Sequence, residues 1–269
     1  MQRDQALPEE AVAASGGAAG GGAAGATVRS RRRTGLRRLA LGLTLLLLAA
    51  GWWLNVPQAP TPADREAIAE MLRRAGHGDL ADFPRPRGFE AQVATVLAVQ
   101  DAVLAAAPID RGIAEGRRRE PPELLSRGYG LCYDRSRAIE KALALFGLET
   151  RHVSLYGTAG LGALEALMTP GSDSHAVSEV RTERGWMTVD SNARWIGLTA
   201  DGRPLSVPQI DADSAAEVGP EAAREPPTLL LVEPHVTLYG LYSRHGEFYP
   251  PFVPFPDVDF RQFLAYTIF

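Results

Sequence analysis

Sixteen consecutive residues without a charged side chain, 39–54, divide the chain into two parts of different character. The part before this run is rich in Ala, Gly and Arg, whereas the part after it has the mixed composition of a globular protein. The roughly 212 residues that follow, 58–269, are enough to bury one core. The sequence therefore predicts a single folded domain behind a separate amino-terminal segment.

The uncharged run has the properties of a membrane anchor. It is slightly shorter than the ~20 residues that cross about 30 Å of hydrocarbon, but Leu36, Val56 and snorkelling arginines beside the run extend the span. Arginines before the run place the amino terminus in the cytoplasm, and a Trp pair at its end suits the far interface. We therefore expect a transmembrane anchor over 36–56 and an exported domain.

A cleaved signal peptide is the alternative, because Ala49 and Gly51 are small residues of the kind a signal peptidase accepts. The 38-residue lead is long for a signal peptide, and the Trp pair is typical of an anchor, so the anchor is favoured. Both interpretations export the domain.

The chain is thus expected to have four parts. Residues 1–35, which include an Ala- and Gly-rich stretch and most of the arginines, form a flexible basic cytoplasmic arm. The anchor at 36–56 is followed by a Pro-containing linker at 57–65 and by the folded domain at 66–269.

The formal net charge of −4 is unevenly distributed, since residues 1–38 carry +4 and the remainder carries −8. An acidic domain is a poor candidate for binding nucleic acid by counterion release, so no nucleic-acid partner is expected. The one cysteine excludes an internal disulfide. Its spacing from the five histidines matches no metal motif, so neither a metal nor another cofactor is predicted.

Hydrophobic periodicity predicts helices over 63–75 and 89–107, a helix from Cys132 that stops at Gly147, and a strand over 150–156. Further along, the patterns predict loops over 157–173 and 199–227, strands over 228–232 and 236–241, and a tail over 248–269 that wraps the core.

Residues 174–181 and 186–190 are predicted to form a hairpin about the turn at 182–185. In that register His175 and Asp190 are diagonal neighbours on one face, about 7 to 8 Å apart at the backbone. A slip of one residue would place them on opposite faces. The predicted hairpin therefore brings an imidazole within reach of a carboxylate.

Cys132 is predicted to begin a helix, where unpaired N–H groups and the helix dipole stabilise a thiolate. An imidazole can take the thiol proton, and a carboxylate can hold the imidazole in the required tautomer. His175 and Asp190 supply these groups. A lone cysteine on an apolar helix is more often a buried small hydrophobe, but the ordered His and Asp favour catalysis.

The role of residues 134–137, which follow the cysteine in the first turn of its helix, has two interpretations. Asp134, Arg135, Ser136 and Arg137 either contact substrate or, as is more common for a charged first turn, form a solvated helix face. The charge of Asp134 would oppose thiolate formation.

The order of motifs resembles the transglutaminase-like superfamily of papain-type cysteine enzymes over about residues 90–195. The matching motifs are Gly130-x-Cys132 at a helix start, Gly147 and Arg151 before a strand, His175-Ala176 with Glu179, and Gly185-Trp186 leading to Asp190. The chain departs from many relatives at Val177, where an aromatic residue is frequent, and at Ser191-Asn192, where Pro is frequent.

The resemblance implies an α+β fold in which the nucleophile helix packs on an antiparallel sheet. It implies that Cys132 is the nucleophile, that His175 is the general base and acid, and that Asp190 orients His175. An upstream helix in such enzymes often supplies an oxyanion-stabilising side chain, and Gln100 is the candidate here.

The expected protein is a cysteine enzyme tethered by residues 36–56 to a bacterial inner membrane, with its domain in the periplasm. It would act on an amide or peptide bond of a protein or peptide in the cell envelope through a thioester. Hydrolysis is slightly favoured over transamidation. The alternative is a noncatalytic envelope module that keeps the fold for binding, and the oligomeric state stays open.

Overall fold

The computed structural model describes residues 22–82, 84–250 and 252–268, and the chain divides into two compact units, Met1–Trp52 and Trp53–Phe269. The helices are α1 (Gly22–Leu54), α2 (Pro62–Arg74), α3 (Phe89–Ala106), α4 (Pro121–Arg127), α5 (Cys132–Leu145), α6 (Ala163–Met168), α7 (Ala212–Ala216) and α8 (Phe260–Phe263). Shorter turns are the 3₁₀ segments η1 (Leu80–Asp82), η2 (Val207–Gln209) and η3 (Leu229–Leu231) and the π-helical η4 (Leu264–Ile268). The strands are β1 (Thr150–Gly157), β2 (Ser174–Thr182), β3 (Gly185–Val189), β4 (His235–Tyr239), β5 (Leu241–Ser243) and β6 (Asp257–Val258).

Helix α1 contains the predicted anchor. It begins at Gly22, so residues 22–35 of the predicted arm are helical. Residues 1–21 of the predicted arm lie outside the described part of the chain, as do the side chains of the Trp pair. The leucines of α1 from Leu36 to Leu48 are all exposed, at 56% or more.

Within the described part of the chain, the one helix whose length and apolarity suit a membrane span is α3. Half of α3 is buried, and it packs against α2 and α5, as a core helix of the domain does. The anchor over 36–56 stays a prediction.

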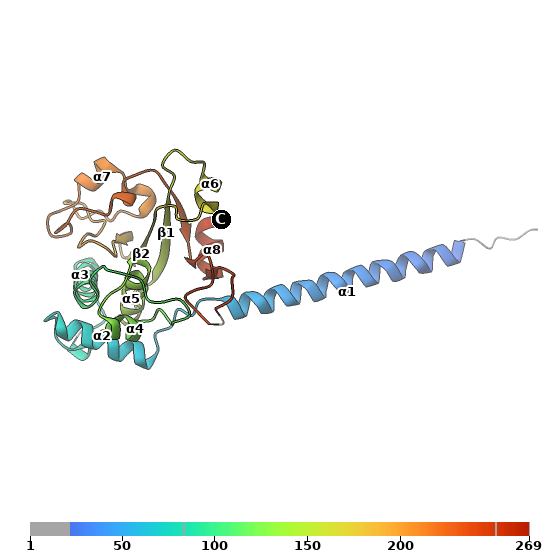
Figure 1. Ribbon diagram of the computed structural model, residues 1–269, viewed down its shortest axis with the longest axis horizontal. Coiled ribbons are helices and arrows are strands. Elements are labelled where there is room, and N and C mark those ends of the chain that lie inside the picture. The colour runs from blue at the N-terminus through green and yellow to red at the C-terminus, as the bar shows by residue number, and fades with distance from the viewer. Residues whose placement is uncertain (1–21, 83, 251, 269) are drawn as a thin grey trace, which may run out of the picture. The chain divides into compact units, whose positions relative to one another are not determined.

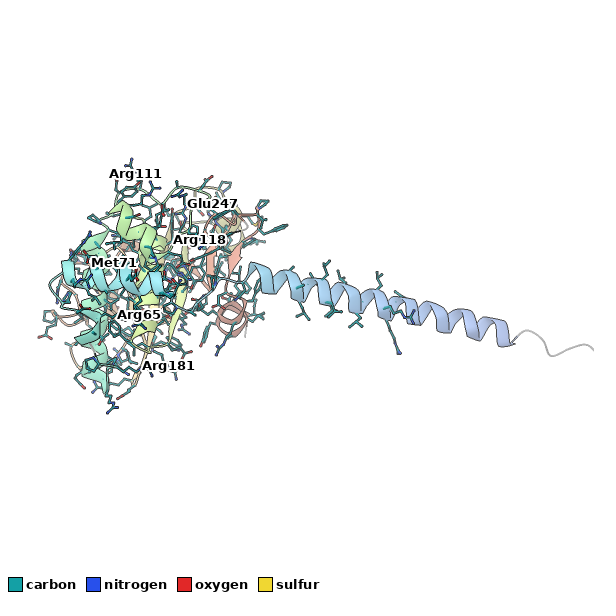
Figure 2. All side chains as sticks on the ribbon, turned by 90° about the horizontal axis from the view of Figure 1, so that it is seen from below. Arg65, Met71, Arg111, Arg118, Arg181 and Glu247 are labelled. Carbon is teal, nitrogen blue, oxygen red and sulfur yellow. The ribbon has the colours of Figure 1, made fainter. Side chains whose placement is uncertain are left out.

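The second unit is built on a four-stranded antiparallel sheet in the order β3-β2-β1-β4. Helix α5 packs on β1 and β2, and α2, α3 and α4 pack around α5 (Figure 1). Side chains fill the domain, with Met71 of α2 buried and Arg111 exposed (Figure 2). The predicted fold class, α+β with the nucleophile helix on an antiparallel sheet, is confirmed.

Two apolar clusters cover the sheet. The first joins the helices to the sheet and includes Ile68, Met71, Val96, Val99, Ile139, Leu143, Val180, Met187 and Val189. The second includes Val153, Leu155, Val177, Trp195, Leu205 and Leu231. Because side chains of a strand alternate between faces, Val177 and Val180 of β2 belong to different clusters, and the sheet is buried on both sides.

The start of α5 depends on a close approach. A Cβ at Gly130 would meet the Cδ1 atom of Leu124 at 2.6 Å and the Cβ atom of Asp134 at 3.1 Å, so a larger residue does not fit. Asp134 then accepts a hydrogen bond from the Leu131 backbone N–H at 3.0 Å, which satisfies a donor at the helix end. The helix stops before Gly147, which has a φ of 78°.

Two sequence predictions are wrong in the domain. Residues 228–232 were expected to form a strand, but the Thr228 backbone N–H donates to the Asp190 carboxylate at 2.8 Å and the next residues form the turn η3. The predicted linker over 57–65 overlaps α2, which begins at Pro62, so its second half is helical.

The segment that precedes α2, residues 55–61, is called the stalk below, and contacts with the domain hold it at Val56, Pro57 and Gln58. Val56 is fully buried, and the Arg137 guanidinium donates to the Pro57 carbonyl and, at 2.9 Å, to Gln58. A buried cation needs acceptors, and the stalk supplies them.

Candidate functional site

The three predicted catalytic residues come from the start of α5 and from the β2–β3 hairpin. Cys132 is the first residue of α5, His175 lies in β2, and Asp190 directly follows β3. The observed register pairs Thr182 with Gly185 and Ser178 with Val189, as the parity argument predicts. The Nε2 atom of His175 lies 2.9 Å from the Oδ1 atom of Asp190.

Asp190 is fully buried and held by several donors. Besides His175, its carboxylate accepts hydrogen bonds from the Asn192 N–H at 2.9 Å, the Thr228 N–H at 2.8 Å and the Thr228 hydroxyl at 3.1 Å. Burial opposes ionisation, but the charge of His175 and these donors outweigh it and lower the pKa of Asp190. The carboxylate is therefore ionised at neutral pH and can hold an imidazolium.

His175 is only 3% exposed, and its Nε2 atom is used by Asp190. Burial lowers its pKa, but the Asp190 carboxylate and the hydrogen bonds to Asp190 and Cys132 outweigh burial and raise the pKa to about 9. The Nδ1 atom is the ring nitrogen that Asp190 does not use, and the nearby thiol of Cys132 is partly exposed. The site thus joins a thiol, an imidazole and a carboxylate in series.

The raised pKa of His175 gives a stability prediction. Because the folded value of about 9 lies above the ordinary 6.5, the stabilising effect is complete below pH 6.5, declines between 6.5 and 9, and is lost above that. At about 1.4 kcal/mol per pKa unit, the free energy of unfolding loses up to about 3 kcal/mol. Urea unfolding at pH 6 and 9.5 should show this loss in wild type and not in His175→Gln. An equal loss in both proteins would contradict the assignment.

The prediction for Gln100 is wrong. This side chain is buried, and its Nε2 atom donates to the backbone carbonyls of Asp190 at 2.8 Å, Ala193 at 3.1 Å and Trp195 at 2.8 Å. Its donors are occupied and cannot serve an oxyanion. Gln100 instead anchors the loop that carries Asp190.

The charged first turn of α5 is not a solvated face, because Asp134, Arg135 and Arg137 are all buried. Asp134 pairs with Arg119 at 3.0 Å, so its charge is compensated and does not oppose a thiolate. Arg137 turns toward the stalk. Arg135 donates to the Oδ1 atom of Asn192, beside the candidate site, and sequence reasoning missed this contact.

Three residues of the matching motifs support the sheet. The Nε atom of Arg151 lies 2.5 Å from Glu179, directly opposite on β2, and Glu179 also accepts from the Val207 N–H at 2.6 Å. The guanidinium stacks on Trp186 of β3 at 4.2 Å and on Tyr239 of β4 at 4.4 Å. This cluster joins all four strands and fixes the sheet that carries His175.

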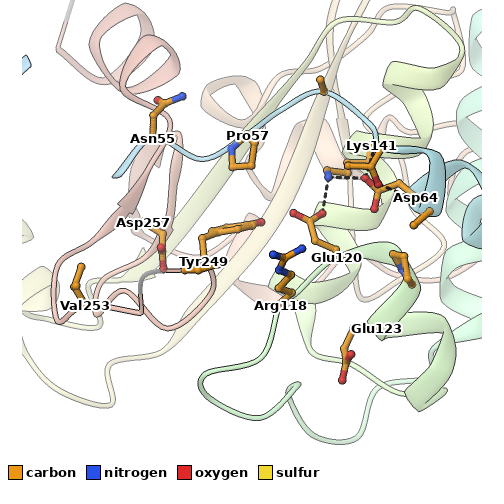
Figure 3. Close-up of a pocket in the computed structure, with 15 residues that line it drawn as sticks. Asn55, Pro57, Asp64, Arg118, Glu120, Glu123, Lys141, Tyr249, Val253 and Asp257 are labelled. Atoms are coloured by element: carbon orange, nitrogen blue, oxygen red, sulfur yellow. Dashed lines mark hydrogen bonds and ion pairs between the residues drawn. The ribbon is translucent and has the colours of Figure 1, made fainter. Parts of the chain in front are cut away.

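A cavity of about 560 Å³ lies elsewhere, between the stalk, the start of α4 and the residues Tyr249, Pro250, Val253 and Asp257 (Figure 3). Beside it the Nζ atom of Lys141 lies 2.7 Å from both Asp64 and Glu120. None of the three candidate catalytic residues lines this cavity. Within the described residues, no group of three or more His, Cys, Asp or Glu side chains is arranged to hold a metal ion.

A thiol at a helix start, joined to a His–Asp pair on an antiparallel sheet, is the arrangement of a papain-type cysteine enzyme fold. Residues 86–191 match the model of the transglutaminase-like superfamily. The match includes Cys132, His175 and Asp190. No curated protein matches the chain.

Proposed function

We propose that this chain is an exported, membrane-tethered cysteine enzyme that cleaves an amide or peptide bond through a thioester on Cys132. The observation that carries the proposal is the 2.9 Å contact between His175 and the buried Asp190 carboxylate, with the Cys132 thiol near enough to raise the pKa of His175. A domain of the transglutaminase-like superfamily supports it, since this fold is typically that of a cysteine enzyme.

The proposed reaction starts from a Cys132 thiolate and a His175 imidazolium. The sulfur attacks the substrate carbonyl carbon, the C–N bond breaks, and the leaving amine takes the proton from His175. Water then gives a proton to His175 and attacks the thioester, and the C–S bond breaks to restore the thiolate. Asp190 stabilises the imidazolium throughout and fixes its orientation.

The proposed location is a bacterial inner membrane, with the domain in the periplasm. It is supported by the uncharged run over 39–54, by the basic residues before it and by the exposed leucines of α1. A reporter enzyme that is active only outside the cytoplasm, fused after residue 60, should be active. An inactive reporter would contradict export.

Alkylation of Cys132 tests the catalytic proposal. Because the chain has one cysteine, iodoacetamide uptake by the full-length protein reports that residue alone. An ordinary thiol is almost entirely protonated at pH 6, so rapid labelling at this pH requires the imidazolium. We expect His175→Ala to slow labelling at pH 6 by about 10- to 100-fold. Rapid labelling that is unchanged by this substitution would refute the pair.

The rival proposal is a noncatalytic envelope module, and slow wild-type labelling at pH 6 would favour it. The acyl acceptor is a separate question. Incubation with envelope peptides and cell-wall fragments, against Cys132→Ala as background, should yield hydrolysed products, whereas covalent joining of an added amine would indicate a transamidase.

A further inference from the structure

Arg135 is a buried cation beside the proposed catalytic pair. It is 2% exposed, and within the described part of the chain its guanidinium forms no ion pair with a carboxylate. Its charge interacts with Cys132, Asp190 and Asp134, yet burial dominates and lowers its pKa. A buried charge without a close counterion is destabilising, so its position calls for a functional explanation.

The directional contact of Arg135 is with Asn192. A guanidinium can only donate, so the atom of the Asn192 amide that faces it must be Oδ1. The amide NH₂ group must then point the other way, and its Nδ2 atom lies 3.5 Å from the Nδ1 atom of His175. Arg135 therefore fixes which end of the amide faces the site.

When His175 is protonated, two hydrogen-bond donors lie next to each other, one on His175 and one on Asn192. The Nδ1–H group of an imidazolium and the NH₂ group of Asn192 cannot hydrogen-bond to one another, because neither has an acceptor to offer. Both are free to donate to a common anion beside His175. The Cys132 thiol is near this ring, since it is among the groups that raise the pKa of His175.

We propose that Asn192 is a further catalytic residue, whose amide NH₂ stabilises the negative charge that forms during attack by Cys132. Arg135 is its positioning residue. This inference rests on the proposed function, and it gives Asn192 the stabilising role that the sequence suggested for Gln100. It also explains why an arginine is buried three residues after the nucleophile.

The test compares acylation by a nitrophenyl ester with alkylation by iodoacetamide in the full-length protein. Asn192→Ala and Arg135→Met should each lower kcat for the ester by about 10- to 100-fold, with little change in KM, because one donor to the developing charge is lost. The double variant should be no slower than the worse single variant, since both substitutions remove the same interaction, the NH₂ donor that Arg135 orients on Asn192. Arg135→Lys should restore part of the rate. Arg73→Met, an exposed arginine on α2, is the matched control and should behave as wild type.

Two outcomes would overturn the inference while leaving the proposed function intact. The first is an Asn192→Ala protein that acylates at the wild-type rate although His175→Ala slows pH 6 labelling as expected. The second is a double variant whose two losses multiply, which would show that the residues act independently. If Arg135→Met does not fold, Asn192→Ala decides alone. Wild-type labelling that does not depend on His175 would instead reject the proposed function.

Discussion

Asp190→Asn should lower turnover of a nitrophenyl ester by about 10³- to 10⁴-fold, the size of effect expected when the carboxylate of such a triad becomes an amide. The substitution keeps the size of the side chain but removes the charge that raises the pKa of His175 to about 9. The imidazole then loses its preferred tautomer and its proton. The measurement is the rate of nitrophenolate release at pH 7 under saturating ester.

Thr228→Val provides the matched control for that experiment. It removes one hydroxyl donor to Asp190, 3.1 Å away, and keeps the backbone N–H that donates at 2.8 Å. A change of only about tenfold is expected, because the charge and the other donors to Asp190 remain and one hydrogen bond to a charged group contributes about 1.5 kcal/mol. If Asp190→Asn kept more than a tenth of the wild-type rate, Asp190 would not be the orienting carboxylate.

The second large effect is on stability. Lys141→Met should lower the free energy of unfolding by about 3 to 5 kcal/mol, because it leaves two carboxylates without their shared cation inside the protein. Lys141 and Asp64 are each 2% exposed, and the Nζ atom is 2.7 Å from both Asp64 and Glu120. Urea unfolding at constant pH measures the change.

Two further variants make this result specific. Adding Asp64→Asn to Lys141→Met should recover part of the loss, because a neutral amide still accepts from the Thr61 N–H but needs no cation. Arg203→Met breaks an ion pair of similar length, 2.8 Å, whose partners are 51% and 59% exposed. It should cost less than about 1 kcal/mol. Equal losses from Lys141→Met and Arg203→Met would contradict the argument from burial.

The hairpin register and the start of the Cys132 helix could be predicted from local sequence patterns. The hairpin register follows from the turn and from alternation, so the His175–Asp190 contact was accessible from sequence spacing. The helix that begins at Cys132 was likewise marked by glycines on both sides and by apolar periodicity. These signals act over a few residues, and distant parts of the chain do not change them.

Long-range contacts account for the errors. Gln100 binds carbonyls that are 90 to 95 residues further along, and Lys141 pairs with Asp64 across 77 residues. A charged side chain is expected to be exposed unless its partner is known, so a solvated face was the more common of the two interpretations for Arg135 and Arg137. The position of each was decided by acceptors in the stalk or in the loop after β3.

The packing of the stalk bears on how far the proposed enzyme can search for substrate. The two ends of a flexible chain of twenty residues are separated by roughly 25 Å on average, so such a chain would let a domain move over that distance. Residues 55–61 are instead held by contacts inside the domain. The stalk is therefore part of the folded domain and adds no reach to a search for substrate.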